Sequence, residues 1–228
     1  MTEVLAALGE RIHPASAELA GESPHIQSEA REHELNVFQA FRRMDEILVS
    51  NFMLFHDLVR EERYDVWIGD EAWELDYFLH ENPEQKSAPY VFLSDFVGWL
   101  PMPEGGAHEA ALCADYNADT IEQIARYPRV RDLSLFVGDP DDVVTDGFGD
   151  GLPPIREWTE RHFRFTGYIT GFDPTTVADR ETLREALGYG AGERVCIATV
   201  GGSGVGEDLL RRVIASFPGA KQRIPASG

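Results

Sequence analysis

Short apolar runs alternate along this chain with segments of helical periodicity, and this alternation is the strongest constraint on its fold. The apolar runs are residues 64–68, 90–93, 133–137, 163–169 and 195–200. Helices are predicted between them at residues 71–79, 108–126 and 180–187. Strands that alternate with helices indicate an α/β protein with a largely parallel sheet.

The longest periodic segment precedes the first apolar run. Apolar side chains recur there at three- and four-residue steps from residue 29 to residue 62, which predicts one long helix. The run at residues 90–93 is almost continuously apolar, as in a strand buried on both faces.

The charge and composition of the chain indicate which classes of binding partner are disfavoured. A hydrophobic fraction of 43% predicts a globular protein. The net charge of −20 disfavours nucleic acid and anionic lipid as partners. Backbone N–H groups at a helix start can still bind a small anion locally.

The sequence shows no targeting or metal-binding signal. No apolar run approaches the roughly 18 residues of a membrane span, and residues 1–14 lack a signal-peptide core. Neither cysteine lies in a C-x-x-C motif, so no zinc site or disulfide framework is predicted, and Cys196 in its apolar run is expected in the core. These features predict a cytoplasmic protein and leave peripheral contact with a membrane open.

A glycine-rich loop joins the last apolar run to a predicted helix. The loop residues are Gly201, Gly202, Ser203 and Gly204. Glycines allow a phosphate to approach the backbone, and the helix start supplies N–H groups and partial positive charge. No Walker lysine follows, so an ordinary ATPase loop is not indicated. The alternative is a tight turn that binds no ligand.

Carboxylates follow two of the predicted strands. Asp70 and Glu71 come after the first, and Asp95 comes after the second. Ligands of parallel sheets bind beyond the carboxyl ends of the strands, so any of the three is a candidate general base. The alternative, clearest for Asp70, is a cap on the following helix.

His80 and several aromatic residues also have two interpretations. His80 is either catalytic or a cap at the end of its helix. The aromatic residues either pack in the core or line a sugar or lipid pocket, a role best suited to Trp99 in its loop: Trp73, Tyr77, Phe78, Trp99 and Trp158.

Several of the segments described above resemble those of a known enzyme family. The segments YDVWIGDEAWELDYFLHENP, VFLSDFVGWLPMP, LFVGDPDDVV and FTGYITGFDP, followed by VCIATVGGSGVGEDLL, resemble the GT-B glycosyltransferases. The similarity is to the group of the peptidoglycan N-acetylglucosaminyltransferase and the UDP-glycosyltransferases, and it spans nearly the whole chain.

The resemblance implies a Rossmann-like parallel sheet of GT-B type in two parts. Residues 1–172 would be an incomplete acceptor-side domain, and residues 173–228 the first βα unit of the nucleotide-sugar-binding domain. The family's opening glycine loop, which often carries a catalytic histidine, is not found. The chain is therefore expected to be an internal piece of a longer enzyme, inactive or impaired by itself, with a loosely attached C-terminal segment of about 35 residues.

The resemblance also implies an activity, which is transfer of a sugar from a nucleotide-diphosphate sugar, expected to be a UDP-sugar, to an acceptor hydroxyl. Gly201 to Gly204 would hold the diphosphate, and no cofactor or metal is implied. Two alternatives remain open. One is a UDP-sugar 2-epimerase-like enzyme, and the other is a non-catalytic binding module. Donor sugar, acceptor, stereochemistry and oligomeric state are left undetermined.

Overall fold

The computed structural model describes residues 2–19, 30–31, 34–35, 45–102, 104–190, 192–200 and 206–223. The chain divides into two units. Unit 1 comprises residues 1–22 and 41–168, and unit 2 comprises residues 23–40 and 169–228. Each unit is described by itself.

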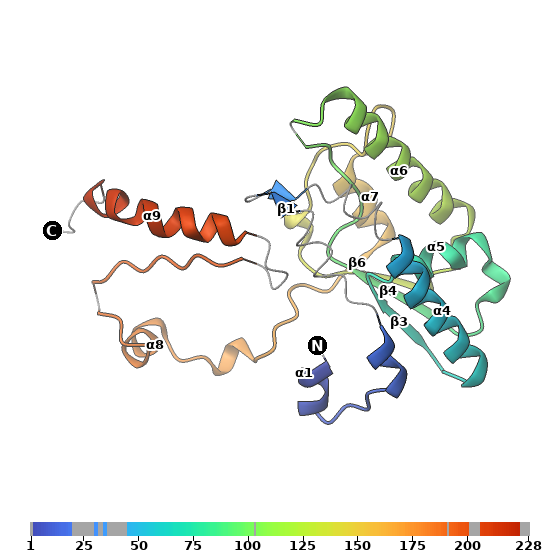
Figure 1. Ribbon diagram of the computed structural model, residues 1–228, viewed down its shortest axis with the longest axis horizontal. Coiled ribbons are helices and arrows are strands. Elements are labelled where there is room, and N and C mark those ends of the chain that lie inside the picture. The colour runs from blue at the N-terminus through green and yellow to red at the C-terminus, as the bar shows by residue number, and fades with distance from the viewer. Residues whose placement is uncertain are drawn as a thin grey trace. The chain divides into compact units, whose positions relative to one another are not determined.

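Unit 1 is built on a four-stranded sheet (Figure 1). Its strands are β3 (Trp67–Asp70), β4 (Tyr90–Ser94), β5 (Leu133–Phe136) and β6 (Arg164–Phe165). They lie in sequence order, and every neighbouring pair is parallel. The predicted α/β class with a parallel sheet is therefore confirmed.

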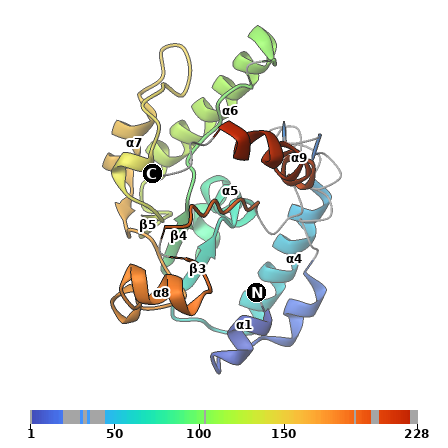
Figure 2. The ribbon, with the colours of Figure 1, turned by 90° about the vertical axis from the view of Figure 1, so that its left-hand side faces the viewer.

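Helices connect each strand to the next. The described helices of this unit are α1 (Thr2–Ala7), α4 (Asp45–Glu61), α5 (Trp73–Glu81), α6 (Gly106–Arg126) and α7 (Ile155–His162). Because α5, α6 and α7 join adjacent strands in one direction and such crossovers are right-handed, the three helices cover the same face of the sheet. Figure 2 shows α4 toward the β3 end of the sheet and α7 toward the β5 end.

The core lies between this helical layer and the sheet. It unites Trp67, Tyr90 and Phe92 of the strands with Leu79 of α5 and Trp158 of α7. Along β4, alternate residues are buried, whereas Val91 and Leu93 are only partly buried. The prediction of a strand buried on both faces is thus wrong, because the described helices pack against one face only.

The described residues of the two units also contain four short 3-10 helices. They span Pro14–Glu18, Pro83–Gln85, Pro140–Asp142 and Pro174–Thr176. The predicted strand at residues 163–169 is confined to β6. Gly167 has a left-handed φ of +67° and bridges Gly138 in antiparallel fashion, which ends the parallel pairing.

Unit 2 contains two short strands and two helices among its described residues. Strand β1 (Ala30–Arg31) pairs with β2 (Glu34–Leu35) in antiparallel orientation, and the helices are α8 (Arg180–Ala186) and α9 (Glu207–Arg223). The predicted helix from residue 29 is therefore wrong at its start, and the described helix α4 begins at Asp45. Apolar periodicity without a capping signal does not locate a helix start.

Residues 195–200 lie outside any strand, which corrects the prediction of a fifth strand there. The side chain of Ile197 is 82% exposed, and Cys196 is exposed rather than in the core. An apolar run becomes a strand only when a neighbour accepts its backbone hydrogen bonds, and the described residues provide none. None of the described helices combines the length and the apolar character that crossing a membrane requires.

Candidate functional site

Glu71 occupies a strained position at the carboxyl end of β3. Its φ of +53° makes it a non-glycine residue in the left-handed region. Its N–H donates to the Leu93 carbonyl at 2.8 Å, and its carbonyl accepts from the Trp73 N–H at 2.8 Å. The tight turn into α5 therefore fixes the backbone of Glu71. Strain of this kind costs about 1–3 kcal/mol and concentrates at functional sites.

The turn brings Glu71 to the end of the neighbouring strand β4. The Glu71 Oε1 atom lies 3.1 Å from the Ser94 hydroxyl and accepts from the Asp95 N–H at 3.3 Å. Ser94 is buried, and Asp95 is exposed. Two carboxylates, at the ends of adjacent parallel strands, thus converge at the edge where such sheets bind ligands.

Burial raises the pKa of Glu71 from 4.5 to about 7, and the nearby Asp95 carboxylate contributes to the rise. Hydrogen bonds from the Asp95 N–H and from Ser94 oppose it. Desolvation and a like charge both disfavour the ionised form. Glu71 is consequently present near neutral pH as both an acid and a base, the condition for efficient proton transfer.

The Ser94 hydroxyl can form a hydrogen bond with both the ionised and the protonated form of Glu71. Its oxygen lies 2.5 Å from the Phe96 carbonyl and accepts from the Phe96 N–H at 3.1 Å. A hydroxyl has one proton, so it donates either to the Glu71 carboxylate or to the Phe96 carbonyl. In the second case, a protonated Glu71 can donate to Ser94. The contact is thus kept when Glu71 gains or loses a proton.

A row of aromatic rings follows the site. The Trp73 ring lies 5.1 Å from the Phe96 ring, which lies 5.4 Å from the Trp99 ring. All three are partly exposed. Aromatic faces of this kind provide apolar contact area for a ligand.

Asn117 of α6 holds the loop that carries Trp99. Its side-chain Nδ2 donates to the carbonyls of Trp99 and Phe148 at 2.8 Å each, and its Oδ1 accepts from the Trp99 N–H at 2.9 Å. Asn117 is 1% exposed. Sequence reasoning did not identify Asn117 as a site residue, because an isolated Asn forms no motif.

The other predicted site residues lie apart from this cluster or outside the described structure. Asp70 is exposed, and its side chain takes part in no hydrogen bond or ion pair found among the described residues. The phosphate loop Gly201, Gly202, Ser203 and Gly204 lies outside the described residues. His80 is 1% exposed, with Nδ1 2.8 Å from the Asp76 carbonyl, as expected for a helix-end packing role.

Within the described part of the chain, no group of His, Cys, Asp and Glu side chains is arranged to hold a metal ion. Comparisons with protein-family models, with curated proteins and with solved structures found no match.

Proposed function

We propose that this chain is the acceptor-side part of a GT-B glycosyltransferase in which Glu71 accepts the proton of the acceptor hydroxyl. The observation that supports this assignment is the position of Glu71 at the carboxyl edge of a parallel sheet, where burial, with a contribution from the nearby Asp95 carboxylate, raises its pKa to about 7.

The proposed step is a displacement at the anomeric carbon of a nucleotide-diphosphate sugar. The acceptor oxygen forms a bond to that carbon while its proton passes to the Glu71 carboxylate. The bond between the anomeric carbon and the diphosphate oxygen breaks, and the nucleoside diphosphate leaves with the electron pair. The loop of residues 201–204 would hold that diphosphate through its backbone N–H groups.

The aromatic row gives the acceptor a place beside Glu71. Trp73, Phe96 and Trp99 form a partly exposed apolar surface next to the ends of β3 and β4. An acceptor with an apolar or sugar-ring face would stack there and direct its hydroxyl toward the carboxylate.

Release of UDP from UDP-glucose and UDP-N-acetylglucosamine, measured with alcohol and glycoside acceptors, tests the assignment. Glu71→Gln removes the base but preserves the shape of the side chain, so UDP release should fall about 100-fold or more. UDP binding, measured by calorimetry, should remain unchanged, because the proposed diphosphate site is elsewhere. Glu122→Gln is the matched control, since it removes one exposed acidic charge from α6.

Other outcomes would separate the alternatives. A folded chain that gives no heat with UDP would favour a non-catalytic module. Formation of an epimerised or free sugar without acceptor would favour the epimerase-like chemistry. Equal rates in the Glu71→Gln variant and the parent chain would remove Glu71 from the mechanism.

A further inference from the structure

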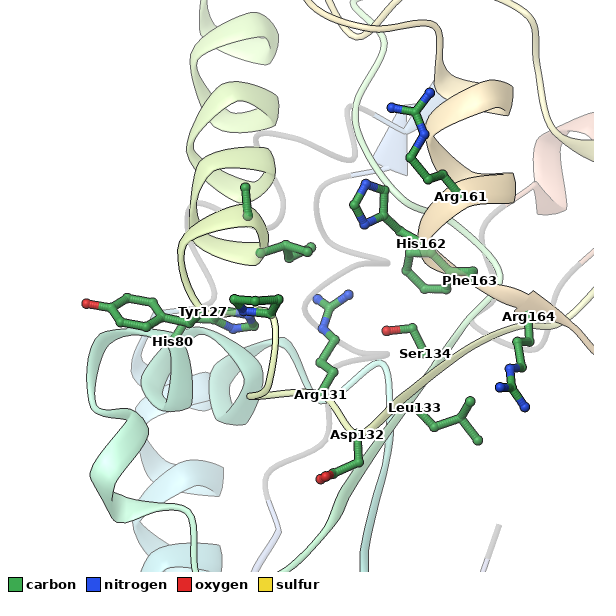
Figure 3. Close-up of a pocket in the computed structure, with 13 residues that line it drawn as sticks. His80, Tyr127, Arg131, Asp132, Leu133, Ser134, Arg161, His162, Phe163 and Arg164 are labelled. Atoms are coloured by element: carbon green, nitrogen blue, oxygen red, sulfur yellow. The ribbon is translucent and has the colours of Figure 1, made fainter.

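A concave site lies at the amino-terminal edge of the sheet, away from Glu71. It is a pocket of about 430 Å³ between the end of α6, the start of β5 and the end of α7 (Figure 3). We propose that this basic pocket binds an organic phosphate monoester. The proposal is independent of sugar transfer, because Glu71 and Asp95 follow the carboxyl ends of the strands.

Arg131 is the fixed cation of the pocket. Its Nε and Nη2 atoms form a bidentate pair with the Asp76 carboxylate at 2.7 and 2.5 Å. Its guanidinium also lies 4.0 Å from the centre of the Phe92 ring. The Nη1 hydrogens have no acceptor among the described residues. One edge of a rigid guanidinium thus remains available to an anion.

Further donors surround Arg131. Figure 3 shows the His162 ring above the guanidinium and the Ser134 hydroxyl turned toward it. His162 is itself held by stacking on Trp158, with ring centres 4.6 Å apart. Burial and the neighbouring Arg161 and Arg131 lower the pKa of His162, and an added anion would raise it.

The charges that line the pocket do not cancel. Asp76 neutralises Arg131, and Lys86 neutralises Asp132 through an ion pair. Arg161 and Arg164 also line the pocket, and neither has an acidic partner among the described residues. The excess is two positive charges, or three when His162 is protonated. Such an excess suits a phosphate dianion better than a carboxylate, in a chain whose net charge is −20.

The apolar part of the lining indicates that the phosphate carries an organic group. Ile124, Tyr127, Pro128, Leu133 and Phe163 all border the pocket. Bare phosphate would leave this surface in contact with water, whereas an aromatic or aliphatic substituent would cover it.

Titration of the full chain with phenyl phosphate, inorganic phosphate and benzoate tests the proposal, with calorimetry and the His162 ring resonances as readouts. Phenyl phosphate should bind saturably and more tightly than the other two, and it should shift the His162 signals. Arg161→Gln combined with Arg164→Gln should weaken phenyl phosphate binding about tenfold or more. These two side chains are exposed, so the variant is expected to fold.

The control is Arg60→Gln combined with Arg63→Gln, which also removes two positive charges, from exposed positions at and just after the end of α4. It should change the affinity less than about twofold, since screened charges at a distance contribute little. The proposal is overturned if phenyl phosphate does not bind saturably, if benzoate binds as tightly, or if the control loses as much affinity as the double variant.

Discussion

At the scale of single residues, Glu71 combines two unfavourable features. Its backbone is in the left-handed region, and its carboxyl group is partly buried beside Asp95. Neither feature helps the chain to fold, and local strain together with a raised pKa is typical of a functional residue. The structural alternative assigned to the strand-end carboxylates, helix capping, does not account for Glu71, because its carboxylate contacts Ser94 and Asp95 instead.

Because the pKa of Glu71 is raised in the folded chain, the free energy of unfolding is expected to depend on pH in a defined direction. Glu71 has a pKa of about 7 in the folded chain against an ordinary value of 4.5, so the folded state keeps a proton that the unfolded state releases. The free energy of unfolding therefore falls as the pH rises from about 4.5 to about 7. After allowance for solvent screening, the loss is about 1–2 kcal/mol.

Urea unfolding of the parent chain and of Glu71→Gln between pH 4 and 8 measures this effect. The difference in the free energy of unfolding between Glu71→Gln and the parent chain should change by the loss given above. The variant should gain stability relative to the parent chain as the pH rises. Asp95→Asn should make the pH-dependent loss of stability smaller, because it removes the negative charge beside the Glu71 carboxylate. A difference that stays constant with pH would contradict the raised pKa.

At the scale of secondary-structure elements, one buried ion pair connects α5 to the segment that precedes β5. Asp76 is 5% exposed and Arg131 is 9% exposed, although 55 residues separate them in sequence. His80 also contacts Asp76, with its Nδ1 atom 2.8 Å from the Asp76 carbonyl. The pair therefore sets where the helix lies against the sheet and, through Arg131, the shape of the basic pocket.

Loss of one partner of this pair should be strongly destabilising. Asp76→Ala leaves the Arg131 charge buried without a partner, and the expected decrease in the free energy of unfolding is about 3–5 kcal/mol. Chemical denaturation checks this, with the exposed Glu122→Gln as control. Asp76→Leu combined with Arg131→Met should recover most of the loss, because no isolated charge remains. A double variant as unstable as Asp76→Ala would show that apolar replacement cannot substitute for the pair.

At the scale of the whole molecule, burial is concentrated in unit 1. Every described residue of the core cluster lies between residues 55 and 165. From residue 169 onward, the described residues are almost all exposed, with Gly206 the buried exception. Segments with few buried contacts open at low free-energy cost.

Limited digestion with trypsin should therefore cut unit 2 first. Arg180 and Arg194 are exposed in that unit, and the expected product retains residues 45–168 and ends no later than Arg180. Mass spectrometry of the early products identifies the cleavage sites. Early cleavage within residues 67–158, before any cut beyond residue 169, would contradict this distribution of stability.

The sequence predicted local secondary structure better than it predicted contacts between distant residues. The four strands of unit 1 and the helices α5 and α6 follow from local periodicity, because burial on one face repeats every two residues in a strand and about every 3.6 in a helix. Helix α7, which has only eight residues, was not predicted. The predicted helix from residue 29 and the strand at residues 195–200 failed, since the same patterns do not say whether a packing partner exists. Asp70, Glu71 and Asp95 were equal candidates in sequence, and only the contacts distinguish Glu71.

By itself, the sequence determined the α/β class, the order of the strands along the chain, the acidic charge and the carboxylates at the strand ends. Only the tertiary structure decided that Glu71 meets Asp95 and Ser94, that Asp76 neutralises Arg131, and that Arg131 shares a pocket with basic side chains of α7 and β6. The physical reason is that side-chain patterns report local burial, whereas distances between remote groups depend on strand register and on the packing of the crossover helices.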